Sequence, residues 1–364
     1  MQTKAKEKIN IVTLGCAKNL VDSEVLMTQL KGNKKDVFHQ REDINPDIVI
    51  INTCGFIDKA KQESIDTILK HAKEKEDGII KKLYVTGCLS ERYKDDLKTD
   101  IPEVDGFYGT RDLPELLKNF EAKYRNELLG DRIITTDSHY AYLKISEGCD
   151  RPCSFCAIPL MRGRHISKPI EQIILEAKNL VRNGVREIML IAQDSTYYGI
   201  DIYKKRAMSE LLKKLSDVEG LDWIRIHYAY PAGFPMDIIE VMRERDNICN
   251  YLDIPLQHGS TNMLKVMKRG ITREKTDELI KNIRDINPEI ALRTTLIAGH
   301  PGETERDFQE MYDFVERSQF DRLGIFTYSH EEGTSAHKLE DDVPEQVKRS
   351  RSNKIMALQQ KISI

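Results

Sequence analysis

The 364-residue chain has no long apolar run, and no apolar stretch follows its first positive charges. A membrane-spanning helix needs about 20 consecutive, mostly apolar residues, and a secretory signal places an apolar segment directly after its basic start. The opening Met1-Gln-Thr-Lys-Ala-Lys-Glu-Lys8 stays polar instead. The sequence therefore predicts a cytoplasmic protein without membrane spans or an export signal.

An excess of basic residues is also absent. The chain has 56 Lys and Arg against 59 Asp and Glu, and its formal net charge is -3. Nucleic-acid-binding domains usually carry a basic surplus or a basic stripe, and the short basic runs at residues 204–206 and 348–351 are interpreted as solvated faces. We therefore expect no direct nucleic-acid binding, because a mildly acidic protein is attracted to a basic partner instead.

Seven cysteines in a chain without an export signal indicate a reducing compartment, where thiols bind metals or take part in catalysis. Three of them, Cys149, Cys153 and Cys156, have the spacing CxxxCxxC. Three thiolates at this spacing can hold a four-iron cube by three corners and leave the fourth iron without a protein ligand. Since an open position can bind a substrate or cofactor, the loop predicts an enzyme with one-electron chemistry.

Zinc is the main alternative for these three cysteines. A structural zinc site takes four ligands in paired spacings, such as CxxC with a second CxxC or with two histidines. The sequence has no second CxxC, and His165 is the histidine that lies near the loop. A disulfide with one leftover thiol is a further alternative. The seventh cysteine, Cys249, has no partner at a matching spacing and is expected to be a core thiol.

Residues 1–128 alternate apolar strand patterns with helical ones and predict a doubly wound parallel α/β sheet. Strands are expected at 9–14, 47–51 and 83–86, with helices at 22–30 and about 58–75. Asp22 or Ser23 can cap the first helix. Each strand is followed by a cysteine, namely Cys16, Cys54 or Cys88. Because parallel strands end along one edge, we expect these three cysteines to converge. Their equivalent positions favour a second cluster over the interpretation that each is a buried core thiol.

A polar stretch at about 126–139 precedes a second α/β domain, expected at 138–340. Its strands are expected at 142–146, 187–192, 223–227, 251–254, 291–298 and 323–327, with helices such as 170–183 and 303–318 between them. A closed barrel of this type has eight strands, so six strands predict a partial, TIM-like (βα)6 barrel. The cysteine loop follows the first strand, at the face where βα loops build active sites.

Five other residues are candidates for holding a cofactor. Phe155, between the last two cysteines of the loop, can shield a cluster or stack on a flat ring, or it simply packs. Gln193 and Asp194 follow the second barrel strand, where they can hold an amino group or cap the next helix. Arg293 and Thr295 share one face of an apolar strand, and a buried Arg calls for an anionic partner such as a carboxylate. No side chain stands out as a general base.

The residues around these cysteines resemble one enzyme superfamily. The CxxxCxxC loop is similar to that of radical S-adenosylmethionine enzymes, and the three spread cysteines upstream are similar to those of its methylthiotransferases. The segments that support this resemblance, and the RimO branch within it, are Cys156-Ala-Ile-Pro-Leu-Met-Arg-Gly163, Ser167-Lys-Pro169, Gly15-Cys-Ala-Lys-Asn-Leu-Val-Asp-Ser-Glu24, Ser146-Glu-Gly-Cys-Asp150 and Ala192-Gln-Asp-Ser195. The tRNA-modifying branch usually carries Gln-Met-Asn where this chain has Ala17-Lys18-Asn19.

The resemblance implies two [4Fe-4S] clusters and S-adenosylmethionine as cofactors. The cysteine loop would hold the cluster that binds S-adenosylmethionine through its amino and carboxylate groups, and one electron would release a deoxyadenosyl radical. The radical would remove hydrogen from the β-carbon of an aspartate in small-subunit ribosomal protein number twelve. The other cluster would present the sulfur for a methylthio group. A flavodoxin or ferredoxin is the implied electron donor.

Three features depart from this family, and two other functions stay open. Members usually end in a small TRAM-like β-barrel that binds substrate; here residues 341–364 predict a helix leading to such a domain, which is missing. Lys168 stands where Arg is commoner, and His300 where Phe is commoner. The same chemistry on a tRNA adenosine is one alternative function. A non-catalytic binding module stabilised by zinc is the other, and it predicts zinc with little iron.

Overall fold

The computed structural model describes residues 7–128 and 130–364, and the chain forms two compact units. The first unit contains the residues up to Lys144 together with Ile158–Gly163 and Glu171–Val185. The second contains Ile145–Ala157, Arg164–Ile170 and Arg186–Ile364. Within the described ranges, no helix is both long enough and apolar enough to cross a membrane.

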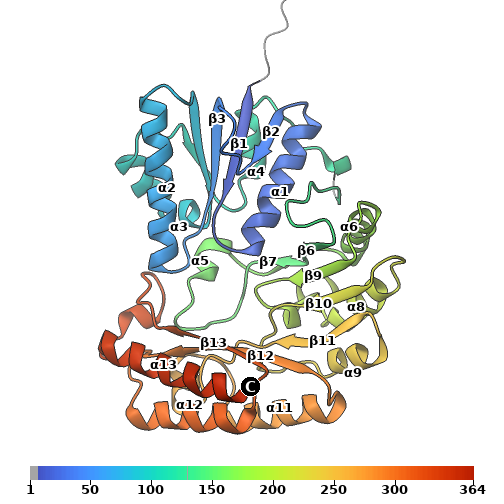
Figure 1. The fold of residues 1–364 in the computed structure, drawn as a ribbon, viewed down its shortest axis with the longest axis vertical. Helices are drawn as coiled ribbons and strands as arrows, with labels where there is room; N and C mark the ends of the chain where they lie inside the picture. Colours follow the sequence, from blue (N-terminus) through green and yellow to red (C-terminus); the bar gives the residue numbers. More distant parts are fainter. Residues whose placement is uncertain (1–6, 129) are drawn as a thin grey trace, which may run out of the picture. The chain divides into compact units, whose positions relative to one another are not determined.

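The first unit is built on a five-stranded sheet in the order β2-β1-β3-β4-β5, and all neighbouring strands pair in parallel (Figure 1). The strands are β1 (Lys8–Thr13), β2 (Asp36–His39), β3 (Ile48–Thr53), β4 (Lys82–Gly87) and β5 (Gly106–Phe107). The helices are α1 (Ala17–Gly32), α2 (Asp58–Glu76), α3 (Cys88–Asp100), α4 (Leu113–Lys118), η1 (Asn126–Leu128), α5 (Ile158–Arg162) and α6 (Ile170–Arg182). The predicted parallel sheet is confirmed, and β2 and β5 add two strands that the sequence pattern did not predict.

The central strand β3 is buried on both faces. Ile50 packs in one apolar cluster with Leu26 of α1, whereas Ile51 packs in another with Ile68 of α2 and Leu89 of α3. Successive side chains of a strand point to opposite faces, so a strand covered on both sides reads as a continuous apolar run. Figure 1 accordingly shows α1 and α2 on opposite sides of the sheet.

Helix α1 begins at Ala17, and the sequence-based start at Asp22 or Ser23 is wrong. That prediction relied on a capping side chain, but the helix starts directly from the turn after β1. Its N-cap residue is Cys16, which makes no side-chain capping hydrogen bond. As a result, Cys16 lies at a helix N-terminus, where free backbone N–H groups favour negative charge.

A second sheet has six strands in the order β13-β12-β11-β10-β9-β6, and the pairs from β9 to β13 are parallel. The strands are β6 (Tyr140–Lys144), β9 (Glu187–Ile191), β10 (Trp223–Ile226), β11 (Ile248–Asp253), β12 (Ala291–Ala298) and β13 (Arg322–Thr327). Because the order is a line and not a ring, the predicted partial barrel of six strands is confirmed.

The second unit contains nine helical segments among the residues that the structure describes. They are η2 (Ser195–Tyr197), α7 (Ile200–Tyr203), α8 (Met208–Ser216), α9 (Asp237–Glu244), α10 (Thr261–Val266), α11 (Arg273–Ile286), α12 (Glu305–Ser318), η3 (Ala336–Lys338) and α13 (Glu345–Ile362). The helix expected within residues 341–364 is therefore present as α13, which packs against β13 and α12.

A buried ion-pair network anchors α13 to the turn after β12. Arg351 Nη1 lies 2.8 Å from Glu303 Oε1, and both side chains are almost fully buried. The other carboxylate oxygen accepts from Gly299 N at 2.8 Å and lies 3.2 Å from His258 Nε2. Buried charges are retained when they are paired and hydrogen-bonded, so this turn serves the packing of α13.

A short antiparallel two-stranded sheet joins the two ends of the segment that carries the CxxxCxxC cysteines. Its strands are β7 (Ser146–Glu147) and β8 (Ile166–Ser167), with Ser146 opposite Ser167. Ser167 makes two further hydrogen bonds. Its backbone N donates to Asp201 Oδ2 at 2.8 Å, and its Oγ accepts from Gly199 N at 2.9 Å. The two-stranded sheet thus fixes both ends of the segment on the second unit.

Candidate metal centres

The first cysteine trio lies at the carboxyl ends of β1, β3 and β4 in the first unit, where Cys54 and Cys88 directly follow their strands and Cys16 lies three residues after β1. Gly15 has φ +88°, and a Cβ there would lie 2.8 Å from Cys54 Sγ, so glycine permits this close approach. Burial raises the pKa of Cys88 to about 12, and charge on Cys16 and Cys54 contributes. Because β1, β3 and β4 are neighbouring parallel strands, the three cysteines follow strand ends along one edge of the sheet.

A buried cation accompanies this trio. The side chain of Arg162 is 2% exposed, and its guanidinium donates to Asp22 Oδ2 at 2.7 Å and to Asn19 Oδ1. Cys88 Sγ lies 3.7 Å from the same amide oxygen. Burial raises the pKa of Cys54, and the charge of Arg162 opposes that rise. The guanidinium thus favours the thiolate form, which is the form that binds metals.

Asn19 joins the strand ends that carry the first trio. Its Nδ2 donates to Leu14 O at 2.8 Å and to Thr53 O at 3.0 Å, which connects the end of β1 with the end of β3. Asn52 on β3 reciprocates by donating to Asn19 O at 2.9 Å. Sequence reasoning assigned no role to Asn19 or Arg162, although both lie inside the motifs that carried the family resemblance.

Replacing Gly87 with alanine is expected to destabilise the first unit by about 3 kcal/mol, because a side chain at φ +102° is strained and its Cβ would lie 2.4 Å from Asn52 Oδ1. The measurement is urea unfolding under anaerobic conditions. Gly78→Ala is the matched control, since Gly78 has φ +74° but open space around its Cβ position, and it should cost about 1 kcal/mol. Equal costs for the two variants would contradict the steric part of this explanation.

The second trio lies on a loop that backbone hydrogen bonds hold in the second unit. Ser154 N donates to Met267 O at 3.0 Å, and Ser154 O accepts from Ala336 N at 2.8 Å. Phe155 meets His300 edge to face with ring centroids 6.5 Å apart. Phe155 therefore packs against a protein ring, and its predicted contact with a cluster or cofactor stays a prediction.

Charges of both signs surround the start of this loop. Burial raises the pKa of Cys149 to about 11, and the backbone N–H of Arg151 donates to its Sγ at 3.4 Å, which opposes the rise. The Arg151 side chain forms an ion pair with Asp194 at 2.7 Å. Two residues that sequence reasoning missed, Tyr230 and Arg269, lie 3.9 and 3.1 Å from Cys153 Sγ, and no sequence motif signalled either of them.

The polar pair after β9 makes contacts within the protein. Gln193 Nε2 donates to Glu147 Oε1 at 3.1 Å, while Gln193 Oε1 is buried without a hydrogen-bond partner. Asp194 caps η2 by accepting from Thr196 N at 2.9 Å, which is the capping role left open by the sequence. The free Gln193 oxygen leaves that residue able to accept from a bound ligand.

Arg293 differs from its sequence-based description as a buried residue. Its side chain is 34% exposed, and its guanidinium pairs with the buried carboxylate of Asp253 on the neighbouring strand β11. The anionic partner is thus provided by the protein itself. Thr295 lies two residues along β12 and is half-buried, like Arg293. A role for either residue toward a cofactor stays a prediction.

The buried imidazole of His300 should make the protein's stability depend on pH. Burial lowers the pKa of His300 from 6.5, so the unfolded chain binds its proton more readily and folding stability falls as the pH drops below 6.5. His300→Phe should lose less stability than wild type when urea unfolding is compared at neutral pH and about pH 5.5. Ser154→Ala removes the contact of Ser154 Oγ with His300 Nε2 at 3.2 Å but keeps the imidazole, and should retain the wild-type pH dependence. An unchanged pH dependence in His300→Phe would refute this assignment.

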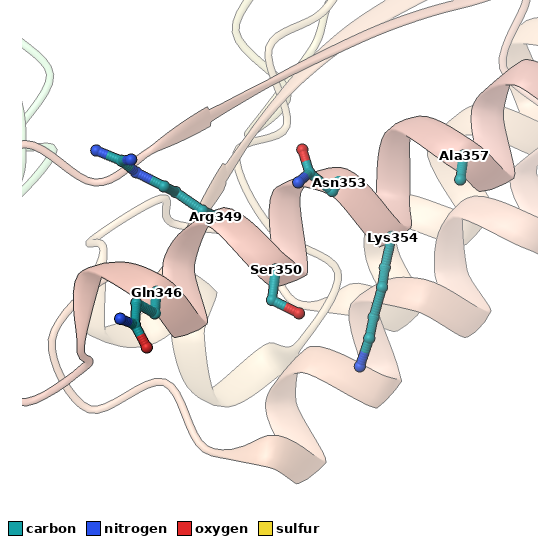
Figure 2. A pocket seen from close by; sticks show the side chains of 6 residues that line it. All are labelled: Gln346, Arg349, Ser350, Asn353, Lys354 and Ala357. Atoms are coloured by element: carbon teal, nitrogen blue, oxygen red, sulfur yellow. The ribbon is translucent and has the colours of Figure 1, made fainter.

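Two hollows of the surface contain none of the predicted site residues. One of 570 Å³ runs along α13 and is lined by Gln346, Arg349, Ser350, Asn353, Lys354 and Ala357 (Figure 2). Another of 690 Å³ lies beside α2.

Cys249 is half-buried beside Arg225, and burial raises its pKa. Among the described residues, no group of three His, Cys, Asp or Glu side chains is arranged around a single metal-ion position.

Comparisons with known proteins cover nearly the whole chain. Residues 8–109 match the Uncharacterized protein family UPF0004, and residues 143–315 match the Radical SAM superfamily. A ribosomal protein uS12 methylthiotransferase RimO from Cytophaga hutchinsonii is 61% identical over 98% of this chain and 82% of its own length. The protein of the same description from Flavobacterium psychrophilum is 60% identical over 100% of this chain and 84% of its own length.

Solved structures resemble this chain in fold. The radical S-adenosylmethionine methyltransferase TsrM from Kitasatospora setae, with cobalamin and a [4Fe-4S] cluster bound, has a TM-score of 0.64 at 15% identity, covering 88% of this chain and 75% of that chain. The cobalamin-dependent S-adenosylmethionine radical enzyme OxsB has a TM-score of 0.60 at 13% identity, covering 98% of this chain and 56% of that chain. At these identities the likeness shows the fold alone.

Proposed function

Because this chain belongs to the family of ribosomal protein uS12 methylthiotransferases, we propose that it adds a methylthio group to the β-carbon of an aspartate in ribosomal protein uS12. The observation that carries the proposal is the identity of about 60% to such enzymes, and the two cysteine trios, each contained in one compact unit, support it. Membership in a family of radical enzymes argues against the zinc-stabilised binding module.

The cofactors of this family are S-adenosylmethionine and [4Fe-4S] clusters. The donor sets fit two such clusters, because all six cysteines of the trios are free thiols. A reduced cluster of this kind supplies one electron to the sulfonium of S-adenosylmethionine. We assign the residues that hold the clusters as two groups: Cys16, Cys54 and Cys88, and Cys149, Cys153 and Cys156. Three thiolates in each group leave one iron free to bind a further ligand.

The protein's own side chains would bind and orient S-adenosylmethionine and shield the cysteine loop from water. We infer that Gln193, with its unpaired buried oxygen, accepts from the amino group of S-adenosylmethionine. Arg293 and Thr295 on β12, and Asp194 after β9, are the other proposed contacts to that cofactor. Phe155 would exclude water beside the cysteine loop. In the first unit, the buried charge of Arg162 would stabilise an anionic sulfur presented to the substrate.

The substrate assignment has a direct test. Mass spectrometry of ribosomal protein uS12, from cells with and without this gene, should show the gain of one methylthio group on an aspartate. Cells that carry the Cys153→Ala variant should lack the modification. Two results together would overturn the proposal in favour of the tRNA-modifying activity. These are unmodified uS12 in cells that have the gene, and the loss of a methylthio group from a tRNA adenosine in cells that lack it.

The partners and location follow from this chemistry. We propose that a one-electron donor protein, a flavodoxin or ferredoxin, reduces the cluster, because a radical enzyme of this kind receives its electron from outside. We also propose that the enzyme works in the cytoplasm, where ribosomal proteins are made and thiols stay reduced. Purified flavodoxin or ferredoxin with its reductase should replace a chemical reductant in a turnover assay.

A further inference from the structure

Arg269 is a buried cation without a carboxylate partner among the residues that the structure describes. It is 5% exposed, and its Nη2 donates to the backbone oxygen of Pro255 at 2.5 Å. Its Nη1 donates to Cys153 Sγ at 3.1 Å, and its buried Nε has no hydrogen-bond partner. Arg is rarely buried unless it is paired. The sulfur of Cys153 is the one group among these contacts that would carry a negative charge, as a thiolate, when it holds a metal.

The guanidinium is held in place by Tyr230. Two arginines stack on the Tyr230 ring, with the guanidinium carbon of Arg269 4.3 Å from the ring centroid and that of Arg151 4.1 Å from it. The Tyr230 hydroxyl donates to Arg269 O at 2.7 Å. Stacking on an aromatic face fixes the plane of a guanidinium and therefore the direction of its N–H groups.

The two arginines of this stack differ in their charge balance. Arg151 forms an ion pair with the carboxylate of Asp194 at 2.7 Å, so its charge is neutralised locally. Arg269 has no such carboxylate and directs an N–H group to the sulfur of Cys153. Its positive charge is therefore available to the thiolate and to the metal group that this thiolate would hold.

We propose that Arg269 is a positioning residue that raises the reduction potential of the iron-sulfur cluster held through Cys153. This inference rests on the proposed function, which assigns Cys153 as a cluster ligand. Reduction adds one electron from a donor protein, or from dithionite in the test, and so increases the negative charge on the cluster and its thiolates. A hydrogen-bonding cation at one thiolate sulfur stabilises that added charge, because net charge and hydrogen bonds to sulfur set such potentials.

The test is a redox titration of the reconstituted full-length protein, followed by electron paramagnetic resonance. The signal of this cluster is identified by its change on addition of S-adenosylmethionine. In Arg269→Gln, the ratio of reduced to oxidised cluster at a given potential should fall about tenfold, which corresponds to a decrease in midpoint of about 59 mV. Arg269→Lys keeps the charge but not the planar fork, and its midpoint should lie between those of Arg269→Gln and wild type.

Two controls separate this role from a general effect on folding. Arg164→Gln removes an arginine whose side chain is 89% exposed, and its midpoint should equal that of wild type. Tyr230→Phe keeps the stacked ring, and should shift the midpoint less than Arg269→Gln. If Arg269→Gln does not retain its cluster, the midpoint of Arg269→Lys alone tests the proposal.

Three results would overturn the inference. The first is an unchanged midpoint in Arg269→Gln with full iron content, and the second is a wild-type midpoint in Arg269→Lys when Arg269→Gln retains no cluster. The third is the absence of any signal in wild type that responds to S-adenosylmethionine. Only this last result also rejects the proposed function, so the two failures are distinguishable.

Discussion

Replacing Cys153 with alanine is expected to remove about half of the iron and labile sulfide from anaerobically purified protein and to abolish methylthio transfer. A four-iron cube held by three thiolates loses a third of its protein ligands with this change. The backbone hydrogen bonds of the loop, such as Ser154 N to Met267 O, do not involve the Cys153 side chain and should persist, so the protein should still fold. Iron and sulfide counting on the purified variant provides the measurement.

The matched variant is Cys16→Ala in the other trio. It should also lose about half of the iron, and the double variant Cys16→Ala with Cys153→Ala should lose nearly all of it, since each trio is proposed to hold its own cube. Cys249→Ala is the control and should keep full iron content, because Cys249 lies beside Arg225 and belongs to neither trio. Retention of all iron in Cys16→Ala would show that the first trio holds no cluster.

Replacing Arg162 with alanine is expected to lower the free energy of unfolding by about 2 kcal/mol, because it removes the hydrogen bonds to Asn19 and to the charged Asp22. The Asp22 side chain is 27% exposed and keeps its ion pair with Lys144, so no buried charge is left unpaired. Arg162 is 2% exposed at its side chain, and both Asp22 and Asn19 accept hydrogen bonds from it. Urea unfolding of anaerobically prepared protein measures the change.

Arg164 supplies the control for this prediction. It lies two residues further along the chain, and its side chain is 89% exposed beside Asp150. Exposed ion pairs contribute little to stability, so Arg164→Ala should change the free energy of unfolding by less than about 1 kcal/mol. A similar loss in both variants would mean that the effect belongs to the segment and not to the buried guanidinium.

Apolar patterns predicted most elements of the fold. The continuous run at the third strand of the first sheet reflects burial on both faces, and the six barrel strands follow their β-rich segments closely. The pattern missed β2 (Asp36–His39) and β5 (Gly106–Phe107), since short edge strands carry few apolar residues. It placed the start of α1 wrongly because Cys16 is not a typical capping residue.

The sequence by itself determined which residues are candidates for the chemistry, because ligand spacing within a loop such as CxxxCxxC is a local property of the chain. Only the tertiary structure decided which distant side chains join them. Cys16, Cys54 and Cys88 follow three neighbouring parallel strands, and the strand order places these strand ends along one edge of the sheet. Arg162 reaches Asp22, 140 residues away in sequence, through the packing of the folded unit. No periodicity encodes such contacts, since they arise only when burial forces each charge to find a partner.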